Sequence, residues 1–260
     1  MDRHWLISYL DASTYMSSKQ VKLKSGIPGF DSIISGGIHE GSSVTISGPS
    51  GSGKTTFGMQ FLYNGAKDFD EPGVFVSLTE GLDQLKSDFA PYGWDLDKLI
   101  EQEKLLVIDS RPFKIEEGFV AQDESLFRGE SLPYMNLTQL ILSSLKRINA
   151  KRLVIDSLTV LATNYTNEFY IQQGLQAMIY ALDKARCTAL LLSERSDPQK
   201  VPLEWFVTTG IVYLYHERRE DAMTRSIQVL KMKGVRHAEQ VYPIKLGETG
   251  LEVLHPRINP

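Results

Sequence analysis

The sequence predicts an α/β fold with a mostly parallel central β-sheet flanked by helices and with antiparallel strands toward the C-terminus. The chain has 260 residues, of which 42% are hydrophobic and 23% charged, as in one soluble globular domain with a packed core. Four short β-prone runs are each followed by polar residues, and the first of them leads into a glycine-rich loop and an amphipathic helix pattern. Because parallel strands end at one edge of a sheet, these polar residues should gather there.

The first strand is predicted over residues 44–47 and is followed by the loop GPSGSGKTT at residues 48–56 and a helix pattern at 57–67. The order strand, glycine loop, helix is the context required by G-x-x-x-x-G-K-[ST], in which backbone N–H groups turn inward around phosphate oxygens. Lys54 would reach the β and γ phosphates of a nucleotide, and Thr55 would offer its hydroxyl to Mg²⁺. The alternative is a chance glycine turn. The predicted nucleotide-binding residues of this segment are Gly48, Ser50, Gly51, Ser52, Gly53, Lys54, Thr55 and Thr56.

The next strand is predicted over residues 73–78, and Thr79, Glu80 and Gly81 leave it at the same edge as the loop. Hydrolysis requires a carboxylate that orients or deprotonates water in line with the γ phosphate, and Glu80 is the candidate. The alternative is a solvated loop acid. The mixed and aperiodic residues 111–135 predict a long surface loop.

A buried strand over residues 153–155 ends in Asp156, which is the predicted acidic partner of the magnesium ion. An aspartate after a strand is also a common helix cap, and that alternative stays open. The predicted metal-site residues are Thr55, Asp156 and Glu80.

The fourth strand, over residues 188–192, ends in Ser193, Glu194 and Arg195 at the same edge. These polar groups could sense whether a γ phosphate is present. The alternative is a surface loop in which the glutamate and the arginine pair with each other.

The stretch KMKGVRH at residues 231–237 concentrates basic side chains in a chain whose formal net charge is -4. Residues 226–233 read as a strand, and its alternation places Lys231 and Lys233 on one face, so that both can point at a single site. The alternative is a solvated hairpin edge, where lysines discourage unwanted strand pairing.

The overall charge and composition exclude several classes of protein. An acidic balance gives no global field for a polyanion, so any nucleic-acid binding must be local. Cys187 is the single cysteine, which excludes an internal disulfide framework and a multi-thiolate metal site. No run of eighteen apolar residues and no signal peptide are present, so we expect a cytoplasmic protein without a membrane anchor. Four histidines without metal-ligand spacing predict no transition-metal site: His4, His39, His216 and His255.

Taken in order over residues 25–254, several segments resemble the KaiC family of RecA-like ATPases. They are GIPGFDSIISGGI, the phosphate loop, FDEPGVFVSLTEG, GWDLDKL, RLVIDSLTVL, SER and LKMKGVRH. The resemblance implies a RecA-type P-loop NTPase core, assembled into a ring with ATP bound between subunits. It further implies that a neighbouring subunit supplies basic side chains to the γ phosphate, as an arginine finger does. The nucleotide-binding residues that the resemblance adds are Ser193 of the SER segment and, from the late segment, Lys231, Lys233, Gly234 and His237. The catalytic candidates are then Lys54, Glu80, Lys231 and Lys233.

The chain departs from the family pattern at several positions. Thr79 replaces the first of two adjacent glutamates, so hydrolysis is expected to be slow. Lys233 replaces an arginine and lacks its planar fork, and Thr209 stands where an aspartate is usual. In two-domain members the second domain phosphorylates an adjacent Ser-Thr pair, which falls here on Trp205 and Phe206, so autophosphorylation at these positions is excluded.

These observations favour a Mg²⁺-dependent ATPase in a homohexameric ring, with ATP as a switch that changes the grip on a protein partner. Two alternatives remain: an ATP-dependent DNA-binding protein of the recombinase type, and a signalling scaffold that binds ATP without hydrolysing it. We expect an N-terminal extension at residues 1–20, in which an apolar cluster suggests a short packing helix, the ATPase domain at 21–256 and a short tail at 257–260.

Overall fold

The computed structural model describes residues 21–110, 132–163, 168–197, 199 and 202–255. Within these residues, nine strands form one sheet in the order β11-β10-β9-β8-β3-β7-β6-β4-β5. The strands are β3 (Ser43–Gly48), β4 (Gly73–Ser77), β5 (Leu105–Asp109), β6 (Arg152–Asp156), β7 (Thr188–Glu194), β8 (Gly210–Arg219), β9 (Ala222–Met232), β10 (Tyr242–Gly247) and β11 (Gly250–Val253). A separate antiparallel pair joins β1 (Lys22–Leu23) to β2 (Ile38–His39).

The sheet has a parallel part and an antiparallel part, as the sequence predicts. Strands β8, β3, β7, β6, β4 and β5 pair in parallel, whereas β9, β10 and β11 continue the sheet beyond β8 in antiparallel pairs. The carboxyl ends of β3, β4, β6 and β7 therefore meet at one edge of the sheet. The end of the antiparallel strand β9 points to the opposite edge.

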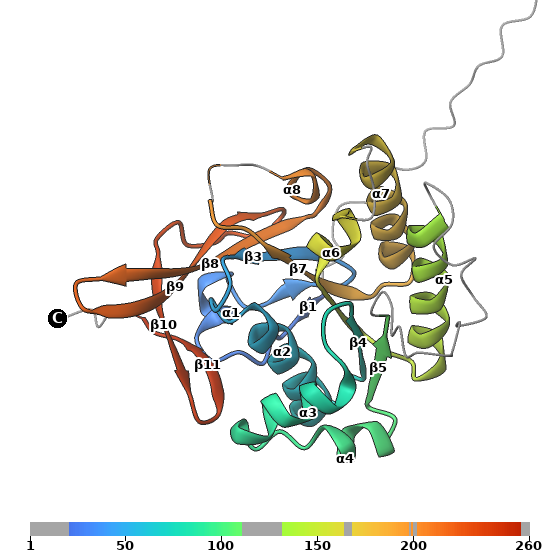
Figure 1. The fold of residues 1–260 in the computed structure, drawn as a ribbon, viewed down its shortest axis with the longest axis horizontal. Coiled ribbons are helices and arrows are strands. Elements are labelled where there is room, and N and C mark those ends of the chain that lie inside the picture. Colours follow the sequence, from blue (N-terminus) through green and yellow to red (C-terminus); the bar gives the residue numbers. More distant parts are fainter. Residues whose placement is uncertain (1–20, 111–131, 164–167, 198, 200–201, 256–260) are drawn as a thin grey trace, which may run out of the picture.

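Helices cover both faces of the parallel part (Figure 1). On one face lie α1 (Phe30–Ile33), α2 (Lys54–Asp68), α3 (Leu82–Phe89), a 3₁₀ turn (Ala90–Tyr92) and α4 (Leu96–Glu101). On the other lie α5 (Leu132–Arg147), α6 (Leu158–Thr163), α7 (Glu168–Lys184) and α8 (Leu203–Val207). Alternate residues of β6 pack in different hydrophobic clusters on the two faces of the sheet. Val154 packs with α2, whereas Leu153 and Ile155 pack with α5 and α7. This two-sided burial explains why the strand is continuously apolar.

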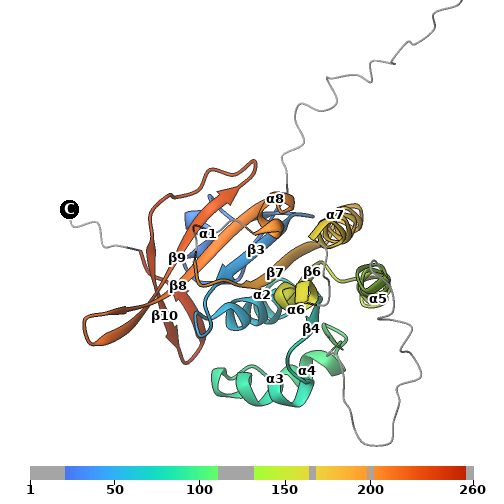
Figure 2. The ribbon, with the colours of Figure 1, turned by 45° about the horizontal axis from the view of Figure 1, so that its top comes forward.

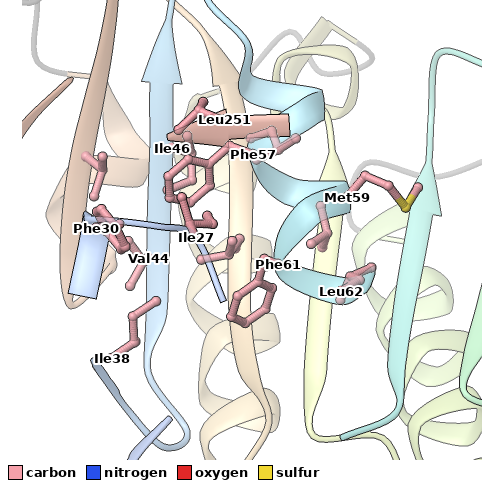
Figure 3. Packing of buried hydrophobic residues seen from close by; sticks show 14 of the residues in the cluster. Ile27, Phe30, Ile38, Val44, Ile46, Phe57, Met59, Phe61, Leu62 and Leu251 are labelled. Carbon is pink, nitrogen blue, oxygen red and sulfur yellow. The ribbon is translucent and has the colours of Figure 1, made fainter. Parts of the chain in front are cut away.

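The core beneath α2 fixes the helix that follows the glycine loop (Figure 3). Phe57 extends from α2 toward Ile46 of β3, and its ring meets Phe30 edge to face at 5.1 Å. Phe61 extends from the same helix into the same core cluster. Gly58 lets the helix approach the sheet, because an added Cβ there would lie 2.8 Å from Val154 Cγ1. The N-terminus of α2 is thus held firmly at the end of β3.

One fully buried arginine ties the start of the domain to the sheet. The Arg152 guanidinium donates hydrogen bonds to the carbonyl oxygens of Lys24 at 2.7 Å and Phe61 at 2.8 Å, and it pairs with the Glu71 carboxylate. Its plane lies over the Phe61 ring, 4.5 Å from the centroid. Burial lowers the pKa of Arg152, and the partial compensation by Glu71 keeps the charge paired.

The four strands that the sequence predicted at this edge, β3, β4, β6 and β7, lie within one or two residues of their predicted bounds, but two other boundaries were wrong. Helix α5 begins at Leu132, so residues 132–135 are not part of a loop, while 111–131 lie outside the described residues. Strand β9 starts four residues earlier than predicted and ends at Met232, with a bulge opposite Ile211 and Val212. Lys233 therefore lies in a turn and not in the alternation of the strand. Residues 1–20 and 257–260 lie outside the described residues.

Candidate nucleotide-binding site

The glycine loop lies at the carboxyl edge of the sheet, between the end of β3 and the start of α2. Gly51 and Gly53 adopt φ angles of 74° and 99°, in the left-handed region that favours glycine. At Gly48 (φ 155°) an added Cβ would lie 2.3 Å from the carbonyl oxygen of Leu214, so only glycine fits against β8. These conformations build the turn that the motif predicts.

The loop contains side chains suited to an anion. Lys54 is buried, and its ammonium donates to the carbonyl oxygen of Pro49 at 2.8 Å. Burial lowers the pKa of Lys54, while the charges of Glu194 and Asp156 act in the opposite direction. The Ser52 hydroxyl is buried and finds no hydrogen-bond partner among the described residues. A cradle with an orphaned hydroxyl and a desolvated cation fits a phosphate group.

Thr55 and Asp156 meet at the mouth of the loop. The Thr55 hydroxyl donates to Asp156 Oδ2 at 2.7 Å, although 101 residues separate them in the sequence. Asp156 is 7% exposed, and burial raises the pKa of its carboxyl against the opposing effects of Thr55 and Lys54. A hydroxyl and a carboxylate beside a phosphate loop form the oxygen donor set that Mg²⁺ prefers, so the residues present fit this ion. The predicted pair is brought together by the parallel order β3-β7-β6.

Glu80 lies at the same edge, in the turn between β4 and α3. The Ser77 hydroxyl donates to the Glu80 carbonyl oxygen and accepts from the Glu80 N–H at 3.1 Å, which fixes the backbone of the turn. Burial raises the pKa of the Glu80 carboxyl, and the nearby carboxylates of Asp88 and Asp156 raise it further. Thr79 beside it is exposed. Glu80 is thus a partly buried acid close to the metal partner, and not a fully solvated one.

The end of β7 does not contain the surface pair of a glutamate and an arginine that the sequence offered as an alternative. Ser193 is fully buried, and its hydroxyl donates to the carboxylate of Glu204 on α8. Arg195 pairs with the same carboxylate at 3.3 Å, so the alternative interpretation, in which Glu194 pairs with Arg195, was wrong. Glu194 instead acts electrostatically on both Lys54 and Asp156. This influence was missed because sequence spacing does not show which of the three polar residues turns toward the loop.

The late basic residues lie away from the loop. The Lys233 N–H donates to the carbonyl oxygen of Thr209, and the Thr209 N–H donates to the carbonyl oxygen of Ser43. Lys233 therefore lies near Ser43, the first residue of β3. The loop follows Gly48, five residues further along β3, which corresponds to about 16 Å of strand. Gly234 and His237 belong to the same turn region, and His237 Nδ1 lies 3.3 Å from the Ala238 carbonyl oxygen. Within one chain the two sets of predicted site residues are therefore separated.

Lys231 is held by two backbone acceptors. Its ammonium donates to the carbonyl oxygens of Trp205 at 2.9 Å and Thr208 at 2.7 Å. Burial lowers its pKa, and the charge of Lys233 adds to this effect. For Lys231 the interpretation as a solvated hairpin edge was wrong, because the ammonium donates to α8 and to the residue after it. Lys233 is exposed. An ammonium has three donors, so one N–H remains for a further acceptor.

A cleft of about 590 Å³ opens at this opposite edge of the sheet. Lys233, Gly234 and Thr209 line one part, and His39, Asp183 and Arg186 line another. A neighbouring cleft is bordered by the exposed ring of Phe206 on α8 and by Tyr180 on α7. This edge therefore presents both charged and apolar groups. Helices able to cross a membrane are absent from the described part of the chain.

These features define the class of P-loop nucleotide-binding proteins. In a parallel sheet, one strand leads into a glycine loop and a helix, and the Asp at the end of a second strand is hydrogen-bonded to the threonine of the loop. The comparisons with known proteins narrow this class. The family model for the ATPase KaiC matches residues 23–258, and the chain belongs to the KaiC family.

Similar proteins include the circadian clock oscillator protein KaiC of Parasynechococcus marenigrum, 31% identical over 236 residues, which are 89% of this chain and 44% of the relative. The circadian clock protein KaiC2 of Synechocystis is 34% identical over 90% of this chain and 40% of its own length. The chain thus spans less than half the length of these relatives. A KaiC-like protein from Pyrococcus horikoshii has a similar crystal structure, with a TM-score of 0.77, 33% identity, and coverage of 90% of this chain and 99% of that one. The predicted family and RecA-like fold are confirmed.

Proposed function

We propose that this protein is a slow, Mg²⁺-dependent ATPase that works between the subunits of a homo-oligomeric ring, most simply a hexamer, and uses nucleotide state as a switch. The observation that carries the proposal is the hydrogen bond of 2.7 Å between Thr55 and Asp156 at the mouth of the glycine loop. Membership of the KaiC family supports ATPase activity in general.

The glycine loop binds the phosphates of ATP. The backbone N–H groups of Gly51, Ser52 and Gly53 and the N-terminus of α2 face the β phosphate. Lys54 exchanges the Pro49 carbonyl oxygen for β and γ phosphate oxygens, which satisfies its buried charge better than a neutral acceptor does. Thr55 and Asp156 hold Mg²⁺, which when bound neutralises charge on the β and γ phosphates.

Glu80 orients the attacking water. Its turn is fixed by Ser77, and the metal-site acid Asp156 lies close enough to raise its pKa. A carboxylate with a raised pKa is a better proton acceptor than an exposed glutamate at the same pH. Glu80 therefore accepts a hydrogen bond from water on the side of the γ phosphate away from the leaving group. It takes the proton of the water as the new O–P bond forms and the bond between the γ phosphorus and the β–γ bridging oxygen breaks, which releases ADP and phosphate.

A second copy of the chain supplies the remaining positive charge. Lys231 and Lys233 lie at the opposite edge of the sheet from the loop of their own chain, so a head-to-tail contact is the arrangement that brings them to a γ phosphate. Gly234 and His237 contribute to the same surface. Lys231 is already fixed by two carbonyl oxygens, which orients its third N–H.

Thr79 makes the reaction slow. The position next to Glu80 is exposed and carries a neutral hydroxyl where the family resemblance implies an acid. This observation also favours a second candidate function, a ring that binds ATP as a structural ligand and does not turn it over.

Phosphate release from Mg-ATP by wild type, Glu80→Gln and Lys231→Ala, with the mass of each assembly measured in parallel, tests these roles. Release by wild type that is lost in both variants while rings persist supports the proposal. An intact ATP-bound ring without phosphate release identifies the scaffold. Loss in Lys231→Ala alone shows that Glu80 is not the water-orienting residue.

A further inference from the structure

The hairpin formed by β8 and β9 extends past the end of β3 and lies against the glycine loop. Pairing between β3 and β8 ends at Ser47 and Tyr213, whereas β8 continues to Arg219 in a ladder with β9. Figures 1 and 2 show the hairpin projecting from the left of the sheet. The hairpin approaches the loop at Leu214 of β8, whose carbonyl oxygen leaves no room for a Cβ at Gly48. The loop is therefore folded directly over this hairpin.

Two basic side chains of the hairpin contact the tip of the loop. His216 and Arg225 are direct cross-strand partners on β8 and β9. Arg225 Nε donates to the Gly51 carbonyl oxygen at 3.0 Å, and His216 Nδ1 lies 3.5 Å from the Ser50 carbonyl oxygen. The imidazole also covers Gly51 so closely that an added Cβ would lie 3.1 Å from Nδ1.

These contacts determine where the loop amides point. In a planar trans peptide, the carbonyl oxygen of one residue and the N–H of the next point in opposite directions. A contact that turns the Ser50 carbonyl toward the hairpin therefore turns the Gly51 N–H away from it. The bond to the Gly51 carbonyl does the same for the N–H of Ser52. These are N–H groups that a phosphate loop directs at its ligand.

We propose that His216 and Arg225 are positioning residues that pre-organise the phosphate loop by holding the carbonyl oxygens of Ser50 and Gly51 on the hairpin side. This inference rests on the proposed nucleotide-binding function and adds to it two residues outside the loop motif. Pre-organisation removes part of the ordering cost of binding, because the amides already face the phosphates. Neither side chain needs to touch the nucleotide for this effect.

The test is the dissociation constant of ADP and of inosine diphosphate, measured by calorimetry for wild type and for matched pairs of variants. His216→Leu and Arg225→Leu remove the donor, whereas His216→Gln and Arg225→Gln keep an amide donor without a positive charge. Lys54→Ala serves as the variant that lacks phosphate binding. Thermal unfolding without nucleotide is measured for every variant.

We expect each leucine variant to bind both diphosphates about ten-fold more weakly, the loss of one hydrogen bond that orders the loop. The glutamine variants should stay within about three-fold of wild type, and the unfolding temperature without nucleotide should be unchanged. Binding by the leucine variants equal to wild type overturns the inference, as does a loss for ADP alone, which would mean that the side chains contact the base. Equal losses in the leucine and glutamine variants mean that charge acts and positioning does not, which also overturns it. If wild type binds no better than Lys54→Ala, the proposed function itself fails.

Discussion

If catalysis requires residues from two copies of the chain, two inactive variants should restore activity when they are mixed in one ring. The variants are Lys54→Ala, which disables the loop, and Lys231→Ala, which disables the late basic segment. Lys233 and the start of the loop are separated by the length of β3, about 16 Å, which is longer than a lysine side chain. No interface between two copies of the same variant is complete.

The size of the recovery follows from the geometry. In a ring assembled at random from equal amounts of both variants, each interface takes its loop from one copy and its late segment from the next. About one interface in four then combines an intact loop with an intact Lys231. Phosphate release per subunit should therefore reach about a quarter of the wild-type rate, while either variant alone stays near background.

The assay is phosphate release by rings that are co-expressed with two different tags and purified on both. The matched control replaces Lys231→Ala by Lys245→Ala, which removes an exposed lysine from β10 without touching either half of the site. Lys245→Ala alone should keep full activity. Doubly tagged rings of correct mass that release no more phosphate than the separate variants would refute the shared site. Full activity of Lys231→Ala alone would also refute it.

Further predictions concern the acid, the core and the cysteine. Burial and neighbouring carboxylates raise the pKa of Glu80, so this group should become protonated, and turnover should be lost, at a higher pH than for an exposed glutamate. A pH–rate profile measures this, and a loss of activity only at the ordinary pKa of glutamate contradicts the prediction. Thr79→Glu should raise phosphate release about ten-fold over Thr79→Gln. Glu71→Gln should lower the free energy of unfolding in urea by about 3–5 kcal/mol, because it leaves the fully buried Arg152 guanidinium without the charge of its partner, and a loss below about 1 kcal/mol would argue against this reasoning. Burial raises the pKa of Cys187 to about 12, so the native protein should resist alkylation at pH 8 until it is unfolded, as mass spectrometry can show.

The sequence predicted the half of the site that depends on parallel strands. Thr55 and Asp156 could be placed together because buried apolar runs give the strand positions and parallel strands share a carboxyl edge. Glu80 was placed at that edge by the same reasoning, and the structure adds its partial burial.

The remaining features depend on contacts between elements whose relative position leaves no trace in local patterns. The pairing of Arg195 with Glu204 requires α8 to pack beside the end of β7, and no spacing rule gives that contact. Strand β9 ends at Met232, so the predicted alternation stops before Lys233, which lies in the turn that follows. The local sequence gives no sign that His216 and Arg225 are cross-strand partners beside the loop, and only the register of β8 and β9 shows it.

The strand order itself links nucleotide binding to assembly in the proposed ring. Strand β8 runs parallel to β3 and, beyond it, carries the residues that lie under the loop, while β9 returns antiparallel and ends at the far edge. One hairpin thus touches the phosphate loop of its own chain through Arg225 and carries Lys231 and Lys233 toward the loop of the next. A shift of this hairpin on nucleotide binding would move both sites together, because the residues are joined by one short ladder of hydrogen bonds. Communication around the ring then needs no separate mobile element, since the hairpin that orders one loop also presents the cations to another.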